Sequence, residues 1–122
     1  MGIKQDWFER QVEALGKAFA GVIFGKEKLL DLAEKYDAVL TQETLDEDIL
    51  ERMLKKYVEN GKLCDAEDLL FESLKENVTP QKIIVCLNFY NQLNDLDENY
   101  LNQHNFSKDE IREGIEELKN YV

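Results

Sequence analysis

Apolar residues recur every three to four positions along most of the chain, and this is the period of an amphipathic α-helix. Asn60 and Gly61 separate two such apolar faces, and both residue types tolerate the left-handed backbone that ends many helices. The pattern predicts a hairpin of two helices over about residues 45–76. The residues of its two apolar faces are Leu50, Met53, Leu54 and Tyr57 on the first helix, and Ala66, Leu69, Leu70, Ser73 and Leu74 on the second.

Helix-capping signals place the other helices. Ser107 with Glu110 matches a capping box, in which a hydroxyl and a carboxylate satisfy each other's backbone N–H groups. Thr79 and Pro80 suit the N-cap and the first position of a helix. The run IIVCLNFY that follows is rich in β-branched residues, but its apolar positions continue at helical spacing to Leu93, which favours a buried helix. The sequence therefore predicts an all-α fold, with helices over about residues 6–24, 26–40, 45–59, 64–76 and 80–94, short turns over 96–104, and a last helix over 108–121.

The predicted first helix, residues 6–24, has an unusually wide apolar stripe. A stripe this wide needs cover from the rest of the domain, from a second copy or from a partner. Because large aromatic side chains anchor interfaces, we predict a homodimer or partner surface at Trp7, Phe8, Val12 and Phe19. The alternative is that these residues fill the core of the monomer. Gly21 and Gly25 have GxxxG spacing, and we interpret Gly25 as a turn.

The hairpin resembles the helix–turn–helix unit of tetratricopeptide (TPR) repeats. Tyr57, Gly61, Ala66 and Pro80 stand near the places where that family has an aromatic residue, a turn glycine, an early alanine and a proline. The family's tryptophan and first-helix glycine are absent, and a shift of 34 residues along the chain preserves apolar character but not residue identity. The resemblance implies three stacked hairpins closed by a C-terminal capping helix over 108–121. A compact helical bundle is the alternative.

The two ends of the chain carry a second resemblance. The opening DWFERQVEALGKAFAGVIFGKE and the tail HNFSKDEIREGIEEL are similar to small helical proteins of Firmicutes, a family with no assigned activity. This resemblance brings no site motif with it. It implies a bacterial cytoplasmic helical protein.

Composition and charge restrict the partners. The 122 residues suit one domain, and 43% hydrophobic with 34% charged residues is typical of a globular chain. The net charge is −11, and most of the excess lies in residues 41–122, so phosphate backbones and acidic membranes are disfavoured. The apolar run of residues 14–25 is too short to span a bilayer. A protein or peptide partner with a basic or apolar segment is therefore expected.

Chemistry-bearing side chains are sparse. Cys64 and Cys86 lie outside any zinc-binding spacing, and we interpret both as small buried residues of a reduced cytoplasmic protein. His104 is the single histidine and has no acidic or cysteine partner at helical spacing, so a loop or capping role is expected. No phosphate loop, nucleophile elbow or metal motif occurs. The sequence predicts a non-catalytic binding or scaffold module without cofactor or metal, and the alternative is a ligand carrier, metal protein or enzyme with a site near His104.

Overall fold

The computed structural model describes residue 10 and residues 13–38 and 45–122, with side chains at 10, 13–32 and 49–122. Every element in these ranges is helical, which confirms the predicted all-α fold. The helices are α2 (Phe19–Phe24), α3 (Lys26–Ala38), α4 (Leu45–Glu59), α5 (Leu63–Glu76), α6 (Pro80–Asn94), α7 (Glu98–Gln103) and α8 (Lys108–Leu118), followed by a 3-10 turn, Lys119–Tyr121. Whether the hairpins stack as TPR units stays a prediction.

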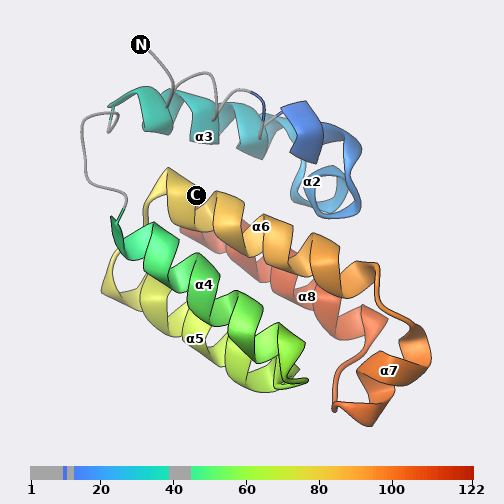
Figure 1. Ribbon diagram of the computed structural model, residues 1–122. Helices are drawn as coiled ribbons and strands as arrows, with labels where there is room; N and C mark the ends of the chain where they lie inside the picture. Colours follow the sequence, from blue (N-terminus) through green and yellow to red (C-terminus); the bar gives the residue numbers. More distant parts are fainter. Residues whose placement is uncertain (1–9, 11–12, 39–44) are drawn as a thin grey trace.

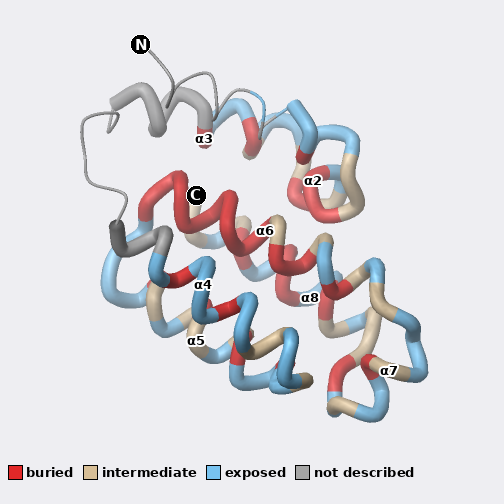
Figure 2. Tube along the Cα trace, in the orientation of Figure 1, coloured by how far each residue is buried: buried red, intermediate tan, exposed pale blue. Residues whose placement is uncertain are grey.

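Helix α6 is the centre of the fold. It packs against α4 on one side, against α2 and α3 on another and against α8 behind, while α5 pairs with α4 (Figure 1). Almost the whole first half of α6 is buried, as the red tube in Figure 2 shows. Thr79 caps the helix by accepting a hydrogen bond of 3.1 Å from the N–H of Lys82, and Pro80 occupies the first turn. The predicted buried helix and its start are confirmed.

Two lysines cap the C-termini of neighbouring helices. Lys82 is 3% exposed, and its amine donates to the carbonyls of Ser73 and Asn77, at the C-terminus of α5. The amine of Lys108 donates to the carbonyl of Asn94, at the C-terminus of α6. A helix C-terminus carries unpaired carbonyls and partial negative charge, so a cation there stabilises it. Each lysine belongs to the first turn of the next long helix, and it therefore fixes the angle between consecutive helices.

The predicted continuous first helix is wrong at Ala18. Residues 13–17 are helical, Ala18 is extended (φ −94°, ψ 163°), and α2 begins at Phe19. The bend brings Gly21 against the carbonyl of Leu15, at a spot where any Cβ would overlap it. It buries Leu15, Ala20 and Phe24 together in the core, which one straight helix with so wide a stripe could not do. Gly25 ends α2 at φ 101°, as the turn interpretation expected.

Candidate functional site

The interface predicted on the first helix falls mostly outside the described residues. Trp7, Phe8 and Val12 are among the residues that the structure leaves undescribed. Phe19 is half-buried at the start of α2 and packs against the core. This surface therefore stays a prediction, and a candidate site has to be sought on the described helices.

Exposed apolar side chains gather on α4. Of the large apolar residues that are exposed in the described ranges, Val22 and Leu30 lie on different helices and Val78 in the loop after α5. Ile49 (45% exposed) and Met53 (41% exposed) differ, because they stand four residues apart and are neighbours on one face of α4. Isolated exposed apolar residues are ordinary, whereas adjacent ones mark contact surfaces.

The apolar surface continues from α4 onto α5. Ile49 and Met53 share a hollow of about 270 Å³ with the half-buried Leu69, and Glu72 and Glu76 line it on the α5 side. A second hollow of about 430 Å³ lies on the other side of Ile49 and Met53. It is lined further by Arg52, Lys55, Lys56 and Glu59. The two hollows leave Ile49 and Met53 standing between them as a ridge.

We call this surface the outer α4–α5 face. It has an apolar centre, a border on α4 that is basic apart from Glu59, and an acidic border on α5. At 100° per residue, Arg52 and Lys56 lie on the side of α4 that turns away from α5, which keeps the two borders apart. The one ion pair in the described part of the chain joins Lys119 and Glu116, so the border charges are not paired with one another there. The seven residues of the face are Ile49, Met53 and Leu69 in the centre, Arg52 and Lys56 on the basic border, and Glu72 and Glu76 on the acidic border.

Sequence reasoning placed Met53 correctly on the apolar side of α4 but did not identify it as exposed. The sequence contains a signal for this exposure, because Ile49 makes the apolar stripe of the helix wider than Leu50, Leu54 and Tyr57 alone would make it. Leu50 and Leu54 fill the core contact of α4, and Tyr57 is half-buried. Where the apolar stripe of a helix is wider than the surface that the neighbouring helices cover, one edge of the stripe stays exposed.

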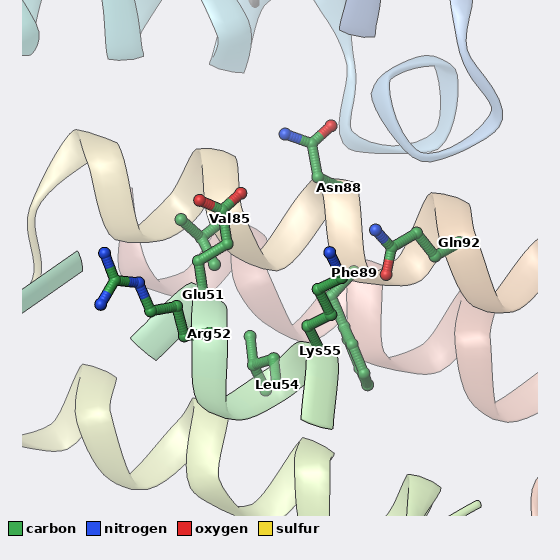
Figure 3. A pocket seen from close by; sticks show the side chains of 8 residues that line it. All are labelled: Glu51, Arg52, Leu54, Lys55, Val85, Asn88, Phe89 and Gln92. Carbon is green, nitrogen blue, oxygen red and sulfur yellow. The ribbon is translucent and has the colours of Figure 1, made fainter. Parts of the chain in front are cut away.

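A separate groove of about 340 Å³ runs between α4 and α6 (Figure 3). Its floor is the buried side chains of Leu54, Val85 and Phe89. Arg52 and Lys55 extend over it from α4, and both residues also line the second hollow beside Ile49 and Met53. The apolar side chains of this groove are buried, whereas Ile49 and Met53 are exposed, so we take the outer α4–α5 face rather than the groove as the candidate site.

Tyr90 and Glu67 hold α5 on the central helix. The hydroxyl of Tyr90 donates a hydrogen bond of 2.6 Å to Oε2 of Glu67. Burial raises the pKa of Glu67, and the hydrogen bond from Tyr90 opposes this rise. Burial and the nearby Glu67 carboxylate raise the pKa of Tyr90. Tyr90 is fully buried and Glu67 is half-buried, and their hydrogen bond serves to position α5.

His104 occupies the joint between the α4–α5 turn and α7. It is the C-cap residue of α7, as the predicted capping role requires, and its ring stacks on Tyr100 with centroids 4.2 Å apart. Its Nδ1 is buried and has no hydrogen-bond partner in the structure. Gly61, at φ 74°, packs so closely on the ring that a Cβ would collide with it. No group of three or more histidine, cysteine or acidic side chains stands ready for a metal in the described ranges.

The interpretation of Cys64 as buried is wrong, whereas that of Cys86 is confirmed. Cys64 follows the first residue of α5 and its thiol donates to the carbonyl of Asn105 at 3.3 Å, beside the hollow next to His104. Partial burial raises the pKa of the Cys64 thiol, and the carboxylates of Glu110 and Glu67 raise it further. A thiol with a raised pKa holds little thiolate at neutral pH, so this arrangement makes a poor nucleophile.

Comparison with known proteins adds a family but no activity. None of the described helices combines the length and apolar character needed to cross a bilayer. No curated protein and no solved structure gives a match to the chain. One family model does match, and it extends over residues 2–122, which is nearly every residue of the sequence. The chain accordingly belongs to DUF6483, a family of unknown function.

Proposed function

We propose that the protein is a non-catalytic protein-binding module that docks a helical segment on the outer α4–α5 face. The observation that carries this proposal is the ridge of Ile49 and Met53, exposed on successive turns of α4 and flanked by hollows on both sides. A helix lays its apolar face into such a surface through side chains spaced three and four residues apart. The ridge and its hollows match that spacing.

The chemistry of the described side chains supports binding rather than catalysis. Cys64 has a raised thiol pKa, and Tyr90 is fully buried against Glu67. His104 is stacked on Tyr100 at the end of α7. A catalytic site needs a nucleophile or base within reach of a substrate and a second group that orients it. None of these three residues offers that combination, so we propose no reaction.

The finer features of the module follow from its sequence. The hairpin of α4 and α5 carries Tyr57, Gly61 and Ala66, and a TPR-like stack of hairpins would present its outer face to a peptide or helix. Two free thiols and the resemblance to Firmicutes proteins support a place in a bacterial cytoplasm. We propose this setting together with the binding role.

Selection from a displayed library of amphipathic helical peptides tests the proposal. The full chain is the bait, and enriched peptides are measured again on the double variant Ile49→Ser/Met53→Ser. We expect the double variant to lose binding by about tenfold or more, because central apolar anchors contribute most of the energy of an interface. The matched control is Val22→Ser, which removes an exposed apolar side chain from another helix and should leave binding unchanged.

Circular dichroism checks that all variants keep their helices, since Ile49 and Met53 are exposed and their replacement should not unfold the chain. Peptides that bind equally well to the wild type and to the double variant would contradict the proposal. So would a selection that enriches no helical peptide.

A further inference from the structure

The charges on the outer α4–α5 face are segregated by helix. Arg52 and Lys56 lie on α4, and Glu72 and Glu76 lie on α5. The shared hollow sets residues 49–53 of α4 level with residues 69–76 of α5. Arg52 therefore lies level with the part of α5 that carries Glu72, with the apolar centre between them, whereas Lys56 lies nearer the turn of the hairpin and Glu76 nearer its open end.

This arrangement makes the face complementary to itself. In a two-fold symmetric pair of chains, the rotation axis lies in the plane of the interface and the same patch meets itself. If the axis runs across the helices, α4 faces α4 and the basic borders repel. If it runs along the helices, α4 of each chain lies over α5 of the other. Arg52 of each copy then meets Glu72 of the other on both sides of the apolar centre, and Lys56 and Glu76 extend the basic and acidic borders in opposite directions from this pair.

We propose that the occupant of the outer α4–α5 face is a second copy of the chain, seated with α4 of each protomer over α5 of its partner. The inference rests on the proposed function and names its partner. Ile49, Met53 and Leu69 of the two copies form the apolar centre, and the charged borders fix the axis and the register. Two hairpins packed in this way form a four-helix bundle at the interface.

The net charge of −11 does not prevent this contact. Much of the acidic excess lies elsewhere, for instance on α8. This helix has two basic residues, Lys108 and Arg112, and five acidic ones, Asp109, Glu110, Glu113, Glu116 and Glu117. Helix α8 packs on α2 and α6, in the layer behind the α4–α5 hairpin (Figure 1). Exposed charges farther apart than a Debye length, about 8 Å at physiological salt, are largely screened. Charges at the face itself act at closer range.

A charge-swap experiment on the full chain tests the inference. One variant, R52E/K56E, makes both borders acidic, and the other, E72K/E76K, makes both basic. Each variant alone should dimerise roughly tenfold or more weakly than the wild type, since like charges then meet across the interface. An equimolar mixture should restore association as a heterodimer, because every acidic border then meets a basic one. Sedimentation over a concentration series gives the affinities, and native mass spectrometry identifies the heterodimer by its mass.

The variant E72K/E76K also distinguishes the effect of charges at the face from the effect of the net charge on self-association. E72K/E76K reduces the net charge from −11 by four units to −7, so general repulsion between copies would predict stronger self-association. The proposed face predicts weaker self-association. The matched control is Glu113→Lys/Glu117→Lys on α8, which makes the same change of net charge away from the face and should not weaken the dimer.

Three outcomes overturn the inference: a wild type that stays monomeric at high micromolar concentration, variants that associate like the wild type, or a mixture that forms no heterodimer. A wild-type monomer that still selects peptides through Ile49 and Met53 would overturn only the identity of the partner. A chain that does neither would overturn the proposed function as well.

Discussion

The side-chain oxygen of Asn91 accepts a hydrogen bond of 2.8 Å from the backbone N–H of Ala20, although the two residues are 71 positions apart. The first N–H groups of a helix have no partner within the helix itself. Ala20 is the second residue of α2, and no side chain of the N-cap residue Ala18 caps the helix. The central helix α6 thus supplies the cap that α2 lacks, and it does so where the chain has just bent.

We expect Asn91→Ala to destabilise the protein by about 1 kcal/mol, which is typical for the loss of a capping side chain. Urea unfolding followed by circular dichroism measures this change, and hydrogen exchange should show faster exchange of the amides of α2. Gln92→Ala, at the exposed neighbouring position, is the control and should leave both quantities unchanged. Equal exchange in the two variants would mean that Asn91 does not hold α2.

Gly114 marks the closest approach of α8 to the central helix. A Cβ at this position would overlap the hydroxyl and ring of Tyr90, which is fully buried and bound to Glu67. In an open helix Gly→Ala stabilises by about 1 kcal/mol, but overpacking a closed core costs about 1–3 kcal/mol. We therefore expect Gly114→Ala to lower the free energy of unfolding by roughly 1 kcal/mol.

Gly16→Ala is the matched control for Gly114→Ala. Gly16 lies in the helical residues 13–17 and has no atom within 4 Å of its would-be Cβ. This substitution should be neutral or slightly stabilising. If both alanine variants were stabilised alike in thermal melts, the contact between Gly114 and Tyr90 would not be too close to accept a Cβ.

Much of the helical layout follows from local signals in the sequence. Thr79 and Pro80 start α6, and the hydroxyl of Ser107 accepts from the N–H of Glu110 at the start of α8, as the capping patterns predict. These signals act within one turn of helix, so the sequence shows them directly. The bend at Ala18 has no such signal, because it depends on the fit of Gly21 against Leu15 and on Asn91 from a distant helix.

The candidate site was predictable only in part. Apolar periodicity identifies the buried edge of α4, but whether Ile49 and Met53 are covered depends on how many helices pack around α4. The segregation of charge between Arg52 and Glu72 depends in turn on which faces of α4 and α5 point outward together. Both properties arise from tertiary packing, which a single sequence does not display.

Glu67 should make stability depend on pH in a defined direction. Its pKa in the folded state is raised by burial, so the native protein binds its proton more tightly than the unfolded chain does. The burial penalty is fully present above the folded pKa and disappears as the pH falls through it toward the unfolded value. We therefore expect Glu67→Gln to gain stability relative to the wild type at neutral pH and to lose this advantage as the pH falls.

Thermal melts of both proteins from neutral pH to about pH 4.5, the ordinary glutamate value, measure this difference. Asp68→Asn, at the exposed next position, controls for the loss of one negative charge. A stability difference between Glu67→Gln and the wild type that does not change with pH would show that the burial of Glu67 does not penalise its charged form.

The two cysteines should differ sharply toward alkylating reagents. Cys64 is exposed and Cys86 is buried within α6, so iodoacetamide should label Cys64 in the native protein and Cys86 only after unfolding. The labelling of Cys64 should still be slow, because burial and the carboxylate of Glu110 raise its pKa and only the thiolate reacts.

Glu110→Gln should therefore increase the rate at Cys64 at neutral pH, whereas Glu113→Gln, one helical turn further along the exposed side of α8, should not. Mass spectrometry of the labelled peptides measures both rates. Equal rates at Cys64 and Cys86 in the native protein would contradict the placement of Cys86 in the core, and an unchanged rate in Glu110→Gln would mean that this carboxylate does not suppress the thiolate.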